Sequence, residues 1–353
     1  MTEYLDISVI FSTYNRRGYL HQTLGAMCAV DREGLNVEFV VVDNNSADDT
    51  AQVIDSFVGR LPLRHLFEER PGKNCALNRA LDTVELGNIV VFTDDDVVPR
   101  KDWLQQVAAA CECWPEYDVF GGKIELIWPD EVEIPKWASE STFIRETGFG
   151  EHDLGTKAVP YQRGCHPSGA NFWVRRKVLS EGARYDESMG PRPGQFFRMG
   201  SEAELLLRLA AGGRLLLYVP GVTVGHHVQV SLLDPRKVLK RAIRSGRGSP
   251  HLHGIPDPVQ LANHPWFWRL RRAGAIVWYR IRVLMAQLRR DKNARVVNAA
   301  NALRFYAYHR EALAMSHKRR VRKEAGAKNE DSAVGNVFDE VICQSSGRGK
   351  VSE

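Results

Sequence analysis

Short apolar runs alternate with amphipathic stretches along the first hundred residues. The runs have the length and the Val, Ile and Phe content of buried strands, and they lie at 7–11, 37–42, 63–67 and 89–93. The stretches between them have helical spacing and lie at 19–29, 46–58 and 74–84, with Ser46 as the predicted N-cap of the second. Strands separated by helices of this length indicate βαβ units. The pattern therefore predicts an α/β fold with a mostly parallel sheet flanked by helices.

Polar clusters follow three of the predicted strands. They are Ser12-Thr-Tyr-Asn15, Asp43-Asn-Asn-Ser46 and Asp94-Asp-Asp96. In a parallel sheet with right-handed crossovers, the carboxyl ends of the strands lie at one edge, and ligands bind there. Three loops that are far apart in the sequence are thus expected to meet in one crevice.

The pattern changes after about residue 118. Residues 120–175 are largely irregular and contain scattered Trp and Pro, as expected for short strands and loops that form a pocket wall. Further strands are predicted at 171–175, 215–219 and 222–224, and a helix is predicted at 201–211. From 235 onward the chain reads as helical and basic, and 324–353 is polar and expected to be disordered.

Charge divides the chain in the same places. Residues 231–323 hold 22 Lys and Arg against 4 Asp and Glu, a net charge of +18, whereas residues 1–230 hold 23 against 33, a net charge of −10. We therefore expect chemistry in 1–230 and attachment to an anionic partner through the helical extension 231–323.

The basic extension also carries apolar and aromatic residues between its arginines, at 266–268, 273–279 and 283–285. Aromatic residues and arginines on one helix suit the surface of an anionic membrane. The alternative is an amphipathic helix that packs on the first domain and leaves a solvated face. A charge of +18 would also attract nucleic acid, but the apolar content makes that partner less favoured.

Nothing in the sequence indicates export or a membrane span. The first six residues are polar and lead directly into a strand, and no run of eighteen apolar residues occurs. Six cysteines are scattered without metal-site or redox spacing, as in a protein with reduced thiols. We expect a cytoplasmic protein, peripheral on the inner face of the plasma membrane.

The acidic triplet is the strongest candidate for chemistry. Three adjacent carboxylates repel one another unless positive charge is near, and a divalent cation supplies it. Alternation along an extended chain puts Asp94 and Asp96 on one side and Asp95 on the other. Asp94 and Asp96 are therefore the predicted ligands of Mn²⁺ or Mg²⁺. An exposed acidic turn before Pro99 is the alternative for an isolated triplet.

The chain resembles the family 2 glycosyltransferases, which have the Rossmann-like nucleotide-sugar-binding fold called GT-A. The resemblance covers residues 7 to 246 and depends on the order of its pieces. They are Val9-Ile-Phe-Ser-Thr-Tyr-Asn15, Val41-Val-Asp-Asn-Asn-Ser46, Pro71-Gly-Lys-Asn-Cys-Ala-Leu-Asn78, Phe92-Thr-Asp-Asp-Asp96, Gly169-Ala-Asn171, Gly200-Ser-Glu-Ala-Glu-Leu205 and His226-His-Val228. It implies a catalytic domain at 1–230, with a donor half at 1–118 and an acceptor half at 119–230.

The resemblance implies roles on the donor side. Ser12 and Tyr14 lie where the family contacts the nucleotide, and Asp43 lies where a carboxylate accepts a hydrogen bond from the base, usually uracil. Lys73 opens a helix after a glycine, which suits a diphosphate. Asp95 is expected to face the ribose or a basic side chain. His226 is the implied third metal ligand, with a merely buried histidine as the alternative.

The resemblance also implies roles on the acceptor side. Where the family has an acidic pair, this chain has Ser201-Glu202, so Glu202 is the predicted catalytic base in place of the usual Asp. Glu204 can instead form a capping box with Ser201. The pocket near the transferred sugar is expected to contain four residues, with core packing as the alternative for the last: Gly169, Ala170, Asn171 and Trp173.

Together these features imply an inverting, metal-dependent hexosyltransferase that uses a nucleotide-sugar, with UDP as the expected nucleotide. A glycan or lipid-linked acceptor is expected, as in polysaccharide or glycolipid biosynthesis. Two alternatives stay open. A sugar nucleotidyltransferase would favour a Gly-rich loop near the N-terminus, where this chain has only Gly18 after residues 12–17. A non-catalytic binding protein would depend on the basic extension alone.

Overall fold

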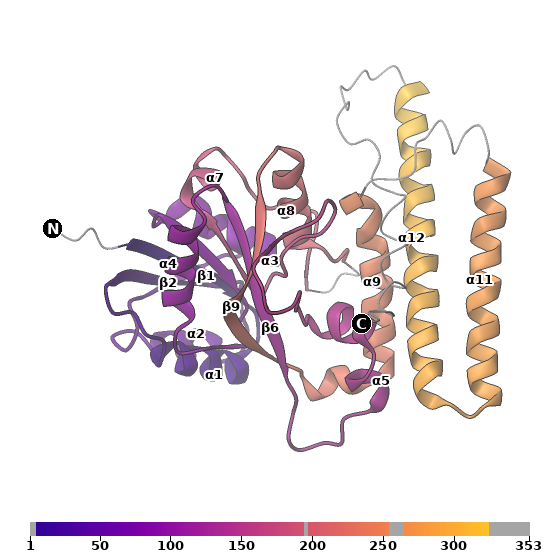
Figure 1. Ribbon diagram of the computed structural model, residues 1–353, viewed down its shortest axis with the longest axis horizontal. Coiled ribbons are helices and arrows are strands. Elements are labelled where there is room, and N and C mark those ends of the chain that lie inside the picture. The colour runs from indigo at the N-terminus through magenta and orange to yellow at the C-terminus, as the bar shows by residue number, and fades with distance from the viewer. Residues whose placement is uncertain (1–4, 194–196, 254–264, 325–353) are drawn as a thin grey trace, which may run out of the picture. The chain divides into compact units, whose positions relative to one another are not determined.

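The structure, a computed structural model, describes residues 5–193, 197–253 and 265–324. Its contacts divide the chain into two units, residues 1–234 and 235–353. The division lies close to the boundary expected at residue 230. The predicted disordered tail, apart from its first residue, lies outside the described residues (Figure 1).

The described part of the first unit is built on one nine-stranded sheet. The strand order is β3-β2-β1-β4-β8-β6-β9-β5, and β7 pairs with β9. The strands are β1 (Leu5–Thr13), β2 (Leu35–Asp43), β3 (Leu63–Phe67), β4 (Ile89–Thr93), β5 (Val97–Pro99), β6 (Val119–Ile127), β7 (Val159–Pro160), β8 (Asn171–Arg175) and β9 (Leu216–His227). The first four strands are parallel to one another, as the βαβ pattern predicts, whereas β8 runs antiparallel to both β4 and β6.

Helices cover the sheet on both faces. The helices of the first unit are α1 (Arg17–Cys28), α2 (Thr50–Asp55), α3 (Lys73–Thr83), α4 (Trp103–Cys113), α5 (Lys136–Ser139), α6 (Thr142–Ile144), α7 (Arg176–Ser180) and α8 (Ser201–Ala211), together with a π-helical turn at Arg145–Phe149 and a 3₁₀ turn at Val230–Leu233. Side chains that alternate along β1 pack in two hydrophobic cores, one on each face of the sheet. Ile7 and Val9 pack with α1, α2 and α4, whereas Ile10 packs with α3, α7 and α8.

Two local predictions are wrong for physical reasons. The second helix begins at Thr50, because the Ser46 amide donates to Asp43 Oδ1 at 3.0 Å and Ser46 belongs to the turn after β2. The segment predicted as two strands, 215–219 and 222–224, is the single strand β9. Its register against β6 shifts after Gly122, and this irregularity takes up residues 220–222 without ending the strand.

The expected capping box of α8 is also wrong. Gly200 is the N-cap, with a φ of 116°, and Ser201 is the first helical residue. Glu204 accepts hydrogen bonds from Arg208 one turn later, at 2.8 and 3.0 Å. The structure thus gives Glu204 a local ion pair in place of a cap.

Two residues expected at the sugar pocket lie in the core instead. Trp173 is fully buried and stacks on Phe120 with ring centroids 5.3 Å apart. Asn171 is also fully buried; its amide donates to the carbonyls of Lys123 and Val222, and its oxygen accepts from Trp103 Nε1. The alternation rule placed both on one face of β8 but did not reveal how deep that face is.

The described residues of the second unit form the helices α9 (Pro235–His253), α11 (Pro265–Leu288) and α12 (Lys292–Glu324). Figure 1 shows them side by side, and α12 packs against both others. A Cβ on Gly246 would lie 2.1 Å from the Arg304 carbonyl oxygen, so glycine allows α9 and α12 to approach closely. Among the described residues, no helix has the length and apolar character needed to cross a bilayer.

Asn171→Ala tests the structural role of this residue. The change leaves the Trp103 indole and two strand carbonyls without their partner in a buried position. We expect the free energy of unfolding to fall by about 2–4 kcal/mol, measured by urea denaturation. The control is Asn36→Ala, because Asn36 is exposed and its side-chain amide donates to the Asp6 carboxylate at the surface. An unchanged free energy of unfolding would instead count against this structural role.

Candidate active site

The loops after β1 and β2 are held together at the carboxyl edge of the sheet. The Asn15 amide donates to Ser46 Oγ at 2.9 Å, and the Ala47 amide donates to Asn15 Oδ1 at 2.7 Å. Asn15 has a φ of 50°, a conformation that asparagine tolerates better than most residues. Two of the three predicted polar clusters therefore meet through direct hydrogen bonds.

The acidic triplet lies between β4 and β5. The short strand β5 pairs antiparallel with the end of β9, so that Val97 lies opposite His226. This pairing places His226 Nε2 3.1 Å from Asp96 Oδ1. Asp94, Asp96 and His226 each offer a ligand atom, and these atoms lie within 4.8 Å of one another.

This donor set fits a divalent cation. Two carboxylates and an imidazole combine hard oxygen ligands with a nitrogen ligand, which suits Mn²⁺ and is less usual for Mg²⁺. Asp96 is buried, whereas Asp94 is partly exposed, so a cation bound here would be open on one side to a substrate. The three residues are the ones that the sequence singled out as metal ligands.

Arg16 is a member of the site that the sequence analysis missed. Its Nη1 donates to Asp96 Oδ2 and lies 3.5 Å from Asp95 Oδ1. Burial alone would raise the pKa of Asp96, but His226 and Arg16 outweigh burial and hold that pKa well below its ordinary value. The signal in the sequence was a basic residue directly after the first polar cluster.

Asp95 behaves differently from its neighbours. Burial raises the pKa of Asp95 to about 6, with Asp96 adding to the rise and Arg16 opposing it. Its partner in the structure is the Arg16 guanidinium, which agrees with the expectation that Asp95 faces the ribose or a basic side chain.

Lys73 is the second basic residue at the triplet, after Arg16. It is the first residue of α3 after Gly72, and the Gly72 amide donates to Asn44 Oδ1 at 2.8 Å. The Lys73 ammonium forms an ion pair with Asp94. Burial lowers the pKa of Lys73, but Asp94 and Glu202 outweigh burial and keep it above its ordinary value. A charged Lys73 thus pairs with Asp94 of the triplet and is also stabilised by Glu202.

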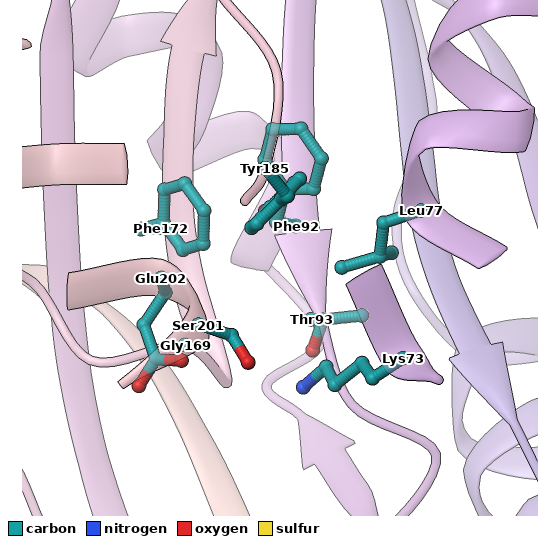
Figure 2. A pocket seen from close by; sticks show the side chains of 9 residues that line it. All are labelled: Lys73, Leu77, Phe92, Thr93, Gly169, Phe172, Tyr185, Ser201 and Glu202. Carbon is teal, nitrogen blue, oxygen red and sulfur yellow. The ribbon is translucent and has the colours of Figure 1, made fainter. Parts of the chain in front are cut away.

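Glu202 lines a pocket that begins at the end of β4. Figure 2 shows Lys73 entering this pocket from α3 and Glu202 from α8, on opposite sides. A Cβ on Gly169 would lie 2.9 Å from Glu202 Cδ, so glycine makes room for the carboxylate. The other lining residues are Leu77, Phe92, Thr93, Phe172, Tyr185 and Ser201.

Tyr185 was not identified from the sequence, although it is a buried member of the pocket wall. Its backbone is fixed by Asn78, whose amide donates to the Tyr185 carbonyl at 3.0 Å and whose oxygen accepts from the Tyr185 amide at 2.9 Å. Burial, with Glu202 and Asp94 adding, raises the pKa of Tyr185 well above its ordinary value. The Tyr185 hydroxyl is therefore neutral in this pocket.

The remaining predicted residues lie at the edge of the sheet or behind it. Ser12 is half-buried at the end of β1, and Tyr14 is exposed in the loop that follows. Asp43 is buried at the end of β2. Ala170 is buried in the core, and its carbonyl accepts from Thr93 Oγ1 at 2.8 Å. Of the four predicted pocket residues, only Gly169 lines the pocket described above.

Comparisons with known proteins give a matching family model and several relatives. Residues 8–182 match the family model described as glycosyl transferase family 2. The glycosyltransferase AglE of Haloferax volcanii is 29% identical over 69% of this chain and 72% of its own length. Validoxylamine A glucosyltransferase of Streptomyces hygroscopicus subsp. limoneus is 31% identical over 30% of this chain. This chain spans only 23% of that second relative.

A solved structure supports the fold. The mannosyltransferase PcManGT of Pyrobaculum calidifontis, determined with GDP-Man and Mn²⁺, superposes with a TM-score of 0.53 and 19% identity. The match covers 87% of this chain and 86% of the other. The likeness shows the shared α/β architecture of GT-A enzymes, and the ligands named belong to that protein.

Asp96→Asn tests the predicted metal ligand without an activity assay. The change keeps the shape of the side chain but removes the charge shared by His226 and Arg16. We expect the affinity for Mn²⁺ to fall by at least about tenfold, measured by isothermal titration calorimetry. The control is Asp49→Asn, because Asp49 is an exposed partner of Arg17 outside the metal group. Equal affinities in Asp96→Asn and the wild type would remove Asp96 from the ligand set.

Proposed function

The chain belongs to glycosyltransferase family 2, as its residues 8–182 show, and from this we propose that it transfers a sugar from a nucleotide-sugar to an acceptor hydroxyl with inversion. One observation carries the proposal. Glu202 lies across one pocket from Lys73, which pairs with Asp94 of the metal group. A base for the acceptor and positive charge for the leaving group thus lie on opposite sides of the space where the sugar would sit.

The donor half of the proposal assigns the nucleotide to the edge formed by β1 and β2. Asp43 would accept a hydrogen bond from an N–H of the base, with UDP as the proposed nucleotide. Ser12 and Tyr14 would contact the nucleoside from the neighbouring loop. Its diphosphate would then extend toward Lys73, whose ammonium and helix N-terminal position both suit phosphate oxygens.

Charge at the leaving group is the main requirement of the reaction. A divalent cation held by Asp94, Asp96 and His226 would supply positive charge near the departing diphosphate. Lys73 adds a fixed positive charge on the same side, and Arg16 keeps Asp95 and Asp96 from repelling each other. We take Mn²⁺ as the proposed cation because the ligand set includes an imidazole.

Glu202 would act as the general base. Its carboxylate takes the proton of the acceptor hydroxyl as that oxygen forms a bond to the anomeric carbon. The bond from the anomeric carbon to the diphosphate oxygen breaks on the opposite face, and its electron pair leaves with the nucleoside diphosphate. A single displacement of this kind inverts the configuration and needs no covalent sugar–enzyme intermediate.

The acceptor is proposed to be a growing glycan or a lipid-linked sugar, as in polysaccharide or glycolipid biosynthesis. A lipid-linked acceptor would place the enzyme in the cytoplasm, at the inner face of the plasma membrane. The strongly basic extension 231–323 is the proposed point of attachment to that face. The alternative of a sugar nucleotidyltransferase receives no support, since the matched family and both relatives reported above are glycosyltransferases.

Glu202→Gln tests the general base. The amide keeps the size of the side chain but cannot take a proton, so we expect kcat to fall by roughly 10²–10⁴-fold. The affinity for the nucleotide-sugar should stay unchanged. The assay is release of nucleoside diphosphate from a panel of nucleotide-sugars with Mn²⁺, together with donor titration by calorimetry.

The matched control is Glu204→Gln. Glu204 lies on the same helix, but it is paired with Arg208 and does not line the pocket. We expect this variant to keep its kcat. If Glu202→Gln turns over at the wild-type rate, another residue is the base, whereas inactivity of the wild type with every donor would count against the transferase itself.

Gly169→Ala tests the position of the Glu202 carboxylate. The added methyl group would lie 2.9 Å from Glu202 Cδ and 3.2 Å from Oε2, so the carboxylate must move. We expect kcat to fall by about tenfold or more, since small misplacements of a reacting group are costly, while the thermal midpoint stays near that of the wild type.

Gly25→Ala is the control for this variant, because nothing lies within 4 Å of a Cβ at Gly25. It should leave kcat unchanged. Full activity of Gly169→Ala would show that Glu202 does not need its present position.

A further inference from the structure

One face of α11 is apolar and exposed. Its members recur at helical spacing over three turns, and each has at least 44% of its surface exposed. They are Val277, Trp278, Ile281, Leu284, Met285 and Leu288, which together we call the α11 stripe. Single exposed apolar residues are ordinary, but a continuous row on one helix face indicates a partner.

The packing of α11 does not explain the stripe. The helix contacts α12 through its other side, where Ala286 is buried and the Tyr279 ring lies 6.2 Å from the Phe305 ring of α12. α11 therefore has two apolar faces. One is used within the second unit, and the stripe is left exposed.

Positive charge borders the stripe. Residues 265–288 contain five arginines and no acidic residue. Arg280 and Arg282 are exposed and lie near either edge of the stripe by helical spacing. The Arg282 guanidinium also lies over the Trp278 ring, 4.7 Å from its centroid. An aromatic ring paired with a cation suits the boundary between headgroups and acyl chains.

We propose that the α11 stripe binds the surface of an anionic phospholipid membrane, with the helix lying in the plane of the interface. The stripe would enter the acyl boundary, and Arg280 and Arg282 would contact lipid phosphates. This proposal names the part of the extension that contacts the membrane. It rests on the proposed function only for the identity of the acceptor. The helix lies on the membrane and does not cross it, since it is too polar to span a bilayer.

Charge distinguishes a membrane from two alternative partners, a second copy of the chain and nucleic acid. A second copy of the chain would bring another segment with a net charge of +18 against the first, and the two would repel each other. Nucleic acid would neutralise the arginines but leave six apolar side chains in water. An anionic membrane satisfies both the charge and the apolar surface.

The test measures binding of the full chain to phosphatidylcholine vesicles with and without phosphatidylglycerol, by co-sedimentation at low and physiological salt. The stripe variant carries Ile281→Gln, Leu284→Gln and Leu288→Gln, because glutamine preserves helix propensity. We expect the wild type to bind the anionic vesicles, and the stripe variant to lose at least about tenfold in partition coefficient.

The matched control carries Val58→Gln, Leu154→Gln and Leu215→Gln. These residues are exposed to a similar degree but lie in the first unit. The control should bind vesicles like the wild type. Equal thermal midpoints for all three proteins would show that the stripe variant is folded. A further variant, Arg280→Gln with Arg282→Gln, should weaken binding to anionic vesicles and reduce its dependence on salt.

Three results would overturn the proposal. The first is a wild type that does not sediment with anionic vesicles, including one that binds duplex DNA instead. The second is a stripe variant that binds vesicles as well as the control does. The third is a wild type that is a dimer in light scattering and a stripe variant that is a monomer. Donor cleavage, measured without vesicles, keeps the two proposals separate. If the stripe variant cleaves donor normally but loses vesicle binding, both proposals stand, whereas vesicle binding without donor cleavage would leave only the membrane contact.

Discussion

The pairing of β5 with β9 is the contact on which the site depends. Three residues of β5 hold the chain directly after the acidic triplet, and the end of β9 supplies His226 opposite Val97. Without this pairing, His226 would have no fixed position beside Asp96, and the triplet would keep only its basic partners Arg16 and Lys73. The β9 irregularity opposite Gly122 lets the strand continue past residues 220–222 and still reach the triplet. The register shift in β9 thus helps to place His226 beside Asp96.

Local patterns in the sequence identified most elements well. The predicted ranges 63–67, 89–93 and 171–175 coincide with β3, β4 and β8, and 201–211 coincides with α8. These segments have clear apolar periodicity, which local residues determine. The strand β5 has only three residues, and its partner lies more than a hundred residues later, so no local pattern could reveal it.

The site shows the same limit. Motif order pointed to Asp94, Asp96, His226 and Glu202 as site residues, and the structure brings the first three together and places Glu202 in the pocket lined by Lys73. The role of Arg16 depends on an approach to a carboxylate 80 residues away. The burial of Trp173 could not be predicted, because residue type and alternation do not say whether a strand face is covered.

The two basic side chains at the triplet have a consequence for selectivity. Arg16 and Lys73 are tethered to the same carboxylates that would hold a metal ion, so each acts as a competitor present at a high effective concentration. An incoming ion must interact with these carboxylates more favourably than a guanidinium and an ammonium do. A monovalent ion would gain less from these carboxylates than a divalent ion, and a bound diphosphate would offer Arg16 and Lys73 new partners. The proposed cation would therefore bind these carboxylates more readily together with a donor diphosphate than alone.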